Sequence, residues 1–183
     1  MARITGERVA LREFRQEDIS AIRSWATDIE TTRTLGGAYL KPQTWEQSER
    51  YLSNLLNGDA GGVNLVIADR ESLRYLGQCS LMMVDNVARH AELAVVMCPV
   101  CQNQGLGQEG VRLMLDFAFR QMNLNRVHLK VRADNERAIR CYEKCGFVKE
   151  GTLRAHAWGD GDYRDVVIMG VLREEFYAES RKK

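Results

Sequence analysis

Gln102-Asn-Gln-Gly-Leu-Gly107 follows the apolar, strand-like run 91–97 and opens a long amphipathic helix pattern. Strand, glycine turn and helix N-terminus together predict an anion-binding site. The first turn of a helix presents backbone N–H groups without partners inside the helix, and the helix dipole adds partial positive charge there. Because Gly105 and Gly107 lack a Cβ atom, an anion can approach this backbone closely. We therefore expect a phosphate or pyrophosphate site at residues 102–107.

The composition is that of a globular protein with little net charge. The 183 residues are 45% hydrophobic and 28% charged, so we expect one domain over residues 1–183. Lys and Arg number 26 against 25 Asp and Glu, which argues against a nucleic-acid partner because such binding needs clustered basic residues. Neither a transmembrane apolar run nor a signal-peptide segment is recognisable, so we expect no membrane partner and a cytoplasmic location.

The five cysteines allow three interpretations. Cys98-Pro-Val-Cys101 has the spacing of a redox motif or of half a zinc site, and Cys141 and Cys145 form a second pair. A zinc site would need both pairs to converge, and their spacing matches no common zinc module. An odd number without a secretory signal favours reduced, mostly buried thiols, so we expect no metal.

Hydrophobic periodicity predicts about seven strands and about four helices. The strands are expected near residues 8–14, 63–68, 75–84, 91–97, 125–132, 147–158 and 163–172. The helices are expected near residues 16–26, 44–56, 107–122 and 135–144, with residues 27–43 irregular. Strands and helices do not alternate regularly, so the fold class is α/β of the α+β type, with a mixed, largely antiparallel sheet.

A second motif follows the glycine turn after an intervening strand. Residues 133–147 read Ala-Asp-Asn-Glu-Arg-Ala-Ile-Arg-Cys-Tyr-Glu-Lys-Cys-Gly-Phe. This stretch resembles motif B of the GNAT N-acetyltransferases, Asn-x-x-Ala-x-x-x-Tyr-x-x-x-Gly-Phe, and residues 102–107 resemble motif A, Gln/Arg-x-x-Gly-x-Gly/Ala. The motif B positions are Asn135, Ala138, Tyr142, Gly146 and Phe147.

The resemblance covers nearly the whole chain. Residues 11–18 are similar to the opening of the RimJ/RimL-like branch, and residues 150–172 to its closing hairpin. Motif B and the hairpin also resemble spermidine N-acetyltransferases. Residues 27–60, a region that helps to shape the acceptor pocket in this family, match least. The resemblance implies a GNAT fold, in which the two central strands splay apart.

The resemblance also implies acetyl-CoA as co-substrate. Backbone amides of the glycine turn would hold the CoA pyrophosphate, and the end of the preceding strand would offer its backbone to the pantetheine arm. Pro99 cannot donate to a ladder, which agrees with strand pairing that ends after Met97. The implied cofactor-binding residues are Val95, Val96, Met97, Gln102, Asn103, Gln104, Gly105, Leu106, Gly107, Gln108, Asn135, Ala138, Tyr142 and Lys144.

Acetyl transfer needs a neutral amine and a proton donor for the departing thiolate. Tyr142 occupies the motif position of the general acid, and a tyrosine hydroxyl with an ordinary pKa near about 10 can donate to the sulfur. Glu92, on the central strand, is the first candidate for the base, with His90, Asp85 and ordered water as alternatives. A backbone N–H of residues 95–97 would polarise the acetyl oxygen.

Structural interpretations stand beside these roles. Tyr142 would also suit simple packing on a short helix, and Glu92 would suit a solvent-facing position or a pair with Arg89. Trp158 and Tyr163, near the last hairpin, suit either an acceptor pocket or packing at the sheet edge.

The acceptor is open between several classes. A protein or peptide N-terminal amine or a small-molecule amine suits the RimJ/RimL-like branch, and a polyamine is the alternative. A polycation needs several carboxylates; residues 35–41 contain none, although Asp28, Glu30, Glu46 and Glu49 lie nearby. A catalytically silent CoA-binding sensor is a third interpretation, which the intact motifs oppose. A homodimer is a further expectation, because exposed strand edges often pair.

Overall fold

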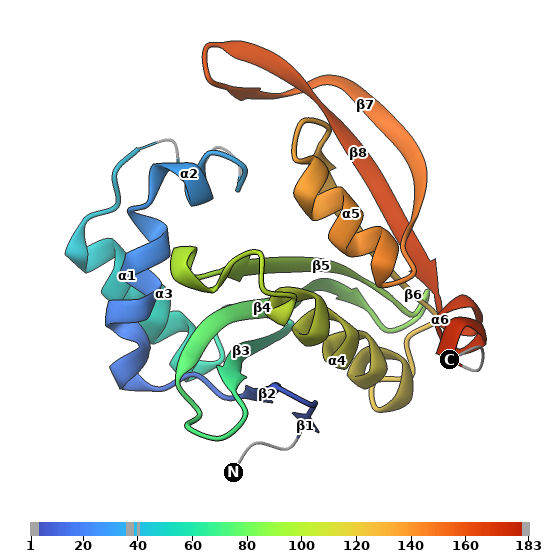
Figure 1. Ribbon diagram of the computed structural model, residues 1–183, viewed down its shortest axis with the longest axis horizontal. Helices are drawn as coiled ribbons and strands as arrows, with labels where there is room; N and C mark the ends of the chain where they lie inside the picture. Colours follow the sequence, from blue (N-terminus) through green and yellow to red (C-terminus); the bar gives the residue numbers. More distant parts are fainter. Residues whose placement is uncertain (1–3, 36–38, 40, 181–183) are drawn as a thin grey trace.

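An eight-stranded sheet runs through the computed structural model, which describes residues 4–35, 39 and 41–180 (Figure 1). The strand order is β1-β2-β3-β4-β5-β6-β8-β7, and every neighbouring pair is antiparallel except β5 with β6. The predicted mixed, largely antiparallel sheet is confirmed; the added strand, β1, is only two residues long and too short for periodicity to reveal. The strands are β1 (Ile4–Thr5), β2 (Val9–Arg12), β3 (Val63–Asp69), β4 (Tyr75–Asp85), β5 (His90–Met97), β6 (Arg126–Arg132), β7 (Val148–Gly159) and β8 (Asp162–Leu172).

Four of the described helices match the predicted ones, and two were not predicted. α2 is a single turn inside the segment expected to be irregular, where Asp28 accepts a hydrogen bond from the backbone N–H of Thr31 at 2.8 Å. One turn cannot display an apolar stripe, so periodicity misses it. α6 packs Phe176 against Phe119, with ring centroids 5.5 Å apart. The helices are α1 (Ile19–Ala26), α2 (Ile29–Thr32), α3 (Trp45–Asn57), α4 (Leu106–Arg120), α5 (Glu136–Lys144) and α6 (Arg173–Ser180).

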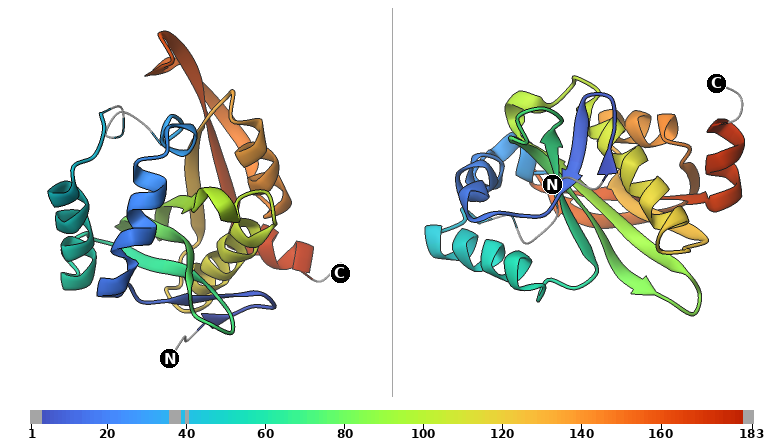
Figure 2. Two further views of the ribbon diagram at one scale, coloured as in Figure 1. Left: turned by 60° about the vertical axis from the view of Figure 1, so that its left-hand side comes forward. Right: turned by 90° about the horizontal axis from the view of Figure 1, so that it is seen from below.

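Helices cover both faces of the sheet (Figures 1 and 2). On one face, Trp25 of α1 is buried and donates its indole N–H to the hydroxyl of Tyr75 on β4 at 3.1 Å. On the other face, α4 approaches β3 so closely that a Cβ atom at Gly110 would lie 2.6 Å from Cδ1 of Ile67. Gly110 therefore sets how near α4, and with it the glycine turn, can come to the sheet.

The parallel strands β5 and β6 separate after three residues. Their register pairs His90 with Arg126, Ala91 with Val127 and Glu92 with His128, and pairing stops there. β5 nevertheless continues to Met97 and stays paired with β4, while β6 continues to Arg132 paired with β8. The implied splay between the central strands is confirmed. From residue 93 onward, one edge of β5 presents backbone N–H and C=O groups toward the gap.

The β7–β8 hairpin projects past α5 (Figure 1). Its turn is Asp160-Gly161, with φ of 57° and 76°, so the predicted hairpin is confirmed with a two-residue turn in the left-handed region. Arg132, at the end of β6, ties this turn to the opposite side of the gap. Its guanidinium contacts Asp160 at 3.2 Å and donates to the carbonyl of Arg33, which caps α2, at 2.7 Å.

Candidate active site

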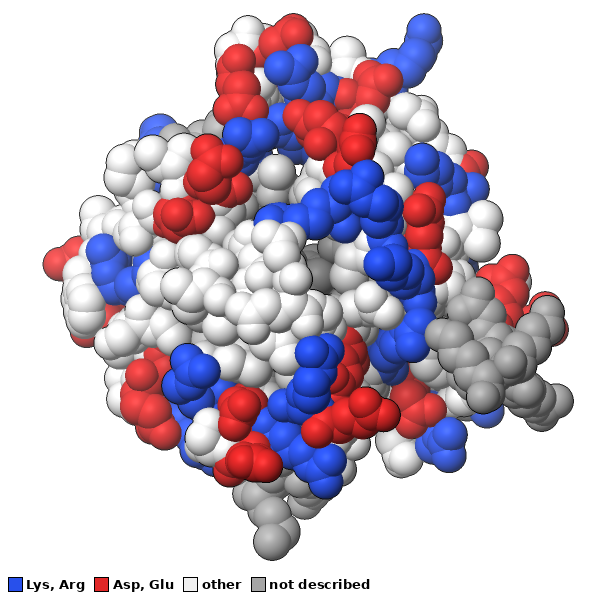
Figure 3. Space-filling model, in the orientation of Figure 1, with Lys and Arg blue, Asp and Glu red and all other residues white. Residues whose placement is uncertain are grey.

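A cleft of about 880 Å³ opens where β5 and β6 separate. β5, the glycine turn, α5, the end of α2 and the β7–β8 hairpin contribute its walls. Figure 3 shows the hollowed face, with Lys and Arg atoms gathered over α5 beside it. Nearly all the predicted site residues line this cleft, from both motifs and both walls. They are Glu92, Val95, Val96, Met97, Gln102, Asn103, Gly105, Gly107, Gln108, Asn135, Ala138, Tyr142 and Lys144.

Gln104 and Leu106 are the two predicted binding residues that do not line the cleft. The Gln104 side chain donates to the carbonyl of Val100 at 2.8 Å, and the backbone carbonyl of Gln104 accepts from the Arg8 guanidinium at 3.0 Å. Leu106 packs against the hydrophobic core. Consecutive residues of a turn point in different directions, so these two side chains stabilise the turn.

The two glycines of the turn have different physical roles. Gly105 is the N-cap of α4 with φ of 77°, a conformation that disfavours any residue with a Cβ atom. Gly107 lies inside the helix, where a Cβ atom would come within 3.1 Å of Cγ of Met97, so it lets α4 approach β5.

The first turn of α4 leaves donors free. The first backbone bond of the helix runs from Glu109 N–H to the carbonyl of Gly105 at 3.1 Å. Within the described part of the chain, the N–H groups of Leu106, Gly107 and Gln108 donate to no acceptor. Unpaired donors at a helix N-terminus are the arrangement that binds phosphate groups.

Tyr142 presents its hydroxyl to the cleft from α5. Its ring packs on Phe147 with centroids 5.8 Å apart, which fixes the side chain. The hydroxyl makes no hydrogen bond to any residue that the structure describes. Burial, with a smaller contribution from the neighbouring thiols of Cys141 and Cys145, raises the pKa of Tyr142 above 10. The phenol therefore keeps its proton at neutral pH, as a proton donor must.

Glu92 lies in the cleft where β5 and β6 begin to separate. Its carboxylate is 3.2 Å from Nζ of Lys130 and 3.8 Å from Nε2 of His128, and its side chain is only 14% exposed. The glutamate is thus neither solvent-facing nor paired with Arg89; a lysine of the adjacent strand is its partner. Glu92 lines the cleft, and its role as the base stays a prediction.

The two other side chains considered as bases lie outside the cleft. His90 packs its ring on His128, with centroids 5.6 Å apart, and the buried Nδ1 atoms of both rings have no hydrogen-bond partner among the described residues. Asp85 accepts backbone hydrogen bonds from Val87 and Ala88 at 2.8 and 2.7 Å in the turn before β5. Neither His90 nor Asp85 lines the cleft.

Sequence reasoning missed most of the charge in the cleft. Arg137 and Arg140 on α5 line it beside the predicted Lys144, and the i, i+3, i+7 spacing of these three residues was the signal that could have found the two arginines. Arg33, Lys130 and Arg132 line the other end. Among the described lining residues, Glu92 is the single carboxylate facing these six cations.

The last hairpin contributes one of its two aromatic side chains. Trp158 lines the cleft and packs on Tyr163 with ring centroids 4.9 Å apart, while Tyr163 does not line it. Both rings are more than half exposed. Trp158 thus stands at the mouth of the cleft, supported from outside by Tyr163.

The remaining chemistry-bearing residues form no second centre. All five cysteines are free, and Cys98 and Cys101 are buried. Among the described residues, no group of three or more His, Cys, Asp or Glu side chains could hold a metal ion. The search for a membrane-spanning helix in the described chain likewise found none.

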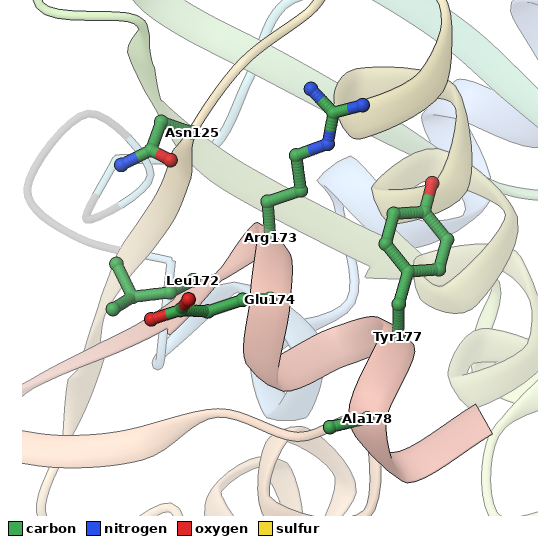
Figure 4. Close-up of a pocket in the computed structure, with 6 residues that line it drawn as sticks. All are labelled: Asn125, Leu172, Arg173, Glu174, Tyr177 and Ala178. Carbon is green, nitrogen blue, oxygen red and sulfur yellow. The ribbon is translucent and has the colours of Figure 1, made fainter. Parts of the chain in front are cut away.

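A smaller hollow lies beside α6, away from the motifs (Figure 4). Asn125, Arg173, Glu174 and Tyr177 contribute its polar side chains, and Arg173 is already hydrogen-bonded to Asn123 at 2.9 Å. No residue of motif A or motif B contributes to it. The cleft between β5 and β6 is therefore the candidate active site.

Comparison with known proteins agrees with this geometry. Residues 8–148 match the family model described as Acetyltransferase (GNAT) domain. The chain therefore belongs to the GNAT acetyltransferase family, whose members take their acetyl group from acetyl-CoA.

Two relatives and one solved structure illustrate the range. The spermidine N(1)-acetyltransferase of Escherichia coli (strain K12) is 30% identical over 123 residues, which are 63% of this chain and 66% of that protein. The uncharacterized N-acetyltransferase p20 of Bacillus licheniformis is 26% identical over 93% of this chain and 96% of its own. The crystal structure of spermidine N-acetyltransferase from Vibrio cholerae, in complex with CoA and spermine, superposes with a TM-score of 0.83. It is 25% identical, and the match covers 94% of this chain and 99% of that one.

Proposed function

We propose that the protein transfers the acetyl group of acetyl-CoA to a primary amine that attacks the thioester directly. The observation that carries this proposal is the opening between β5 and β6. Three free N–H groups of the first turn of α4 flank it on one side, and the unpaired Tyr142 hydroxyl flanks it on the other. The opening thus has an anion-binding end and a proton donor along one continuous cleft.

The lining residues suit each part of acetyl-CoA. The free donors at the start of α4 would bind the pyrophosphate. The unpaired edge of β5 at Val95–Met97 would hydrogen-bond the pantetheine amides as a neighbouring strand would. The side-chain oxygen of Asn135 accepts a hydrogen bond from the backbone N–H of Ala138 at 3.2 Å. This bond caps α5 and leaves the side-chain N–H₂ group to donate to the pantetheine. Arg137, Arg140 and Lys144 add positive charge near the phosphates.

The chain's own groups would then move two protons and stabilise one charge. Acetyl-CoA supplies a thioester carbonyl. Glu92 would accept the proton of the incoming amine, directly or through water. A backbone N–H of residues 95–97 would donate to the carbonyl oxygen as negative charge develops on it. Tyr142 would give its proton to the sulfur that departs.

The charge of the cleft favours an acceptor that carries one amine. Among the described lining residues Glu92 is the single carboxylate and already pairs with Lys130, so a second or third ammonium group would find no further carboxylate in the lining. Of the 35–41 stretch considered for carboxylates, residues 36–38 and 40 lie outside the described residues. A peptide N-terminal amine, or a small-molecule amine with a neutral or anionic remainder, fits this surface best.

A polyamine is the second candidate, because two of the proteins similar to this chain carry spermidine acetyltransferase names. A polyamine acceptor would need carboxylates near the acceptor end of the cleft. Glu92 lies there, and Asp28 and Glu30 lie nearby in the α2 region. Because the described lining offers a single carboxylate to a polycation, we rank a polyamine below a monoamine.

A thiol-release assay on purified protein tests both candidates. Saturating acetyl-CoA is offered with peptides of varied N-terminal residue, a simple monoamine, an aminoglycoside and spermidine. We expect kcat/KM to be highest for a peptide or monoamine. A value for spermidine more than about tenfold above all others would replace the first candidate by the second. Acetyl-CoA binding with no release for any amine would instead support a CoA-binding sensor.

A further inference from the structure

One thiol of the cleft has no role in acetyl transfer. Cys141 lies on α5 directly before Tyr142 and lines the cleft. It is half-buried, whereas the other four cysteines, Cys101 in the cleft wall included, are 6% exposed or less. A thiol that is accessible from a small-molecule cleft can react with a compound that enters it.

We propose that Cys141 is a site of reversible mixed-disulfide formation with anionic small-molecule disulfides, of which glutathione disulfide is the test compound. The adduct would occupy the cleft and exclude acetyl-CoA; this second half rests on the proposed function.

Neighbouring groups activate this thiol. Cys145, the C-cap of α5, lies one helical turn after Cys141, is 2% exposed, and donates its S–H to the carbonyl of Gln108 at 3.6 Å. The neighbouring Cys145 thiol and the positive charges of Lys144, Arg112 and Arg137 hold the pKa of Cys141 below its usual range, although burial opposes the shift. The reactive thiolate is therefore more populated at neutral pH than in a free cysteine.

The backbone around the pair is held in place. The carbonyl of Lys144 accepts a hydrogen bond from Arg112 of α4, and the Gln108 carbonyl accepts the one from Cys145. Cys145 is thus held against the chain just after the glycine turn, while Arg112 brings a third cation to the Cys141 thiol. The same arrangement fixes the neighbouring thiol and supplies the positive charge.

The exchange balances without a further reactant. The Cys141 thiolate attacks one sulfur of the incoming disulfide, and a new S–S bond forms as the old one breaks. Cys141 is oxidised, and the other half of the disulfide is reduced and leaves as a thiolate that takes a proton from water. The cations flanking Cys141 attract an anionic disulfide more strongly than a neutral one, and added salt weakens this preference by screening the charges.

The blocking effect follows from position. Ala138 is one turn before Cys141 and Tyr142 directly follows it, and all three line the cleft. An adduct on Cys141 would fill the space into which acetyl-CoA must enter. Bound acetyl-CoA should in turn shield the thiol.

Intact-mass and peptide mass spectrometry test the modification. The protein is incubated with glutathione disulfide or neutral hydroxyethyl disulfide, and each rate is divided by that of a free model thiol. We expect one adduct, on Cys141, with a normalised rate at least about tenfold higher for the anionic compound and a preference that shrinks in high salt. Saturating acetyl-CoA should slow the reaction. No adduct, an adduct on another cysteine, or equal normalised rates would overturn the proposal.

Three variants give matched controls. Cys141→Ser should abolish the adduct, and Cys101→Ser should leave its rate unchanged. Cys145→Ala removes the neighbouring thiol and should slow the reaction; a rate equal to that of the wild type would refute activation by Cys145. Circular dichroism confirms that each variant is folded.

Calorimetry with acetyl-CoA separates this inference from the proposed function. Modified protein should not bind acetyl-CoA, and a reducing thiol should restore binding. Unchanged binding after full modification would overturn the blocking half. If unmodified protein binds no acetyl-CoA, the proposed function fails, while the adduct on Cys141 is judged by mass spectrometry alone.

Discussion

Tyr142 combines three properties at the scale of one residue. It follows the motif spacing, lines the cleft, and has a hydroxyl without a partner in the described chain. Its raised pKa keeps the proton in place until a basic thiolate appears. Tyr142→Phe should therefore lower kcat by about a hundredfold or more. The acetyl-CoA Kd should change little, because the phenyl ring can keep its packing on Phe147.

Thiol release and calorimetric titration measure these two quantities separately. The variant Tyr163→Phe, which removes a hydroxyl outside the cleft, is the matched control and should keep wild-type kcat. A folded Tyr142→Phe enzyme with wild-type kcat would show that another group protonates the leaving thiolate.

Gly105 provides a second test on a single residue. Its φ of 77° strains any residue with a Cβ atom, so Gly105→Ala should destabilise the protein by about 1–2 kcal/mol and weaken acetyl-CoA binding. Gly151→Ala, in β7, is the control, because a Cβ atom there meets nothing within 4 Å. Urea unfolding measures the stability of both variants. Equal stability of the two variants would mean that the turn relaxes at no cost.

Part of the cleft lining could be predicted, but the full set of lining residues could not. Tyr142 and both glycines of the turn line the cleft as the motifs imply, and Glu92 lines it as its place on the central strand suggests. Gln104 and Leu106 do not, because a motif lists consecutive residues whose side chains diverge in space. Arg137 and Arg140 were missed because they occupy unspecified positions of motif B.

At the scale of elements, a buried ion pair fastens β2 to the start of α1. Arg12 donates to both carboxylate oxygens of Asp18, at 2.9 and 2.7 Å, and both side chains are 2% exposed. Asp18→Ala would leave the guanidinium buried and uncompensated, so it should lower the free energy of unfolding by about 3–5 kcal/mol. Glu17→Ala, at an exposed neighbouring position, should change it by about 0.5 kcal/mol at most. Denaturant titration would contradict this account if the two variants had equal stability.

Glu109 couples α4 to β2 and makes their contact pH-dependent. Burial works against its ionised form. Hydrogen bonds from the backbone N–H groups of Arg8 and Val9 and the Arg8 guanidinium outweigh burial, so the pKa of Glu109 lies below 4.5. A carboxylate with a lowered folded-state pKa stabilises the fold above its unfolded pKa. That contribution is lost as the pH falls through the folded-state value.

The Glu109→Gln variant tests this coupling. Wild-type stability should decline more steeply below about pH 4.5 than that of the variant, which lacks the ionisable group. Glu49→Gln, an exposed substitution on α3, controls for the loss of one carboxylate. Thermal unfolding across pH 3–6 measures the slopes. Parallel curves for wild type and Glu109→Gln would contradict the assignment.

Elements with a full apolar stripe or an alternating pattern could be predicted; the shortest could not. α4 and α5 begin within one residue of their expected starts, because glycine and asparagine mark those ends. α2 and β1 span too few residues for a period to appear, and contacts with other parts of the chain hold them.

At the scale of the whole molecule, charge distribution matters more than net charge. The net charge is only +1, yet the described cleft residues include six cations and one carboxylate. Composition excludes a strongly basic surface but cannot reveal that cations from α5, β6 and α2 gather around one cleft, because folding brings them together. The acceptor could not be read from the sequence for the same reason, and the homodimer stays a prediction.

Charge around the cleft should govern acetyl-CoA affinity. The double variant Arg137→Gln/Lys144→Gln should raise the Kd by about tenfold or more and flatten its dependence on salt. Arg120→Gln, on α4 outside the cleft and paired with Asp116, removes one cation as a control and should leave the Kd unchanged. Titrations at several salt concentrations provide the comparison. If the Kd of the wild type and that of the double variant depended equally on salt, the phosphates of acetyl-CoA would have to bind elsewhere.

The most direct test of the central claim is calorimetric titration of the purified protein with acetyl-CoA. The account predicts saturable binding at one site per chain, weakened by the Arg137→Gln/Lys144→Gln variant and by Gly105→Ala. Absence of binding by folded wild-type protein would contradict it, and residues 102–107 would then be an ordinary start of a helix.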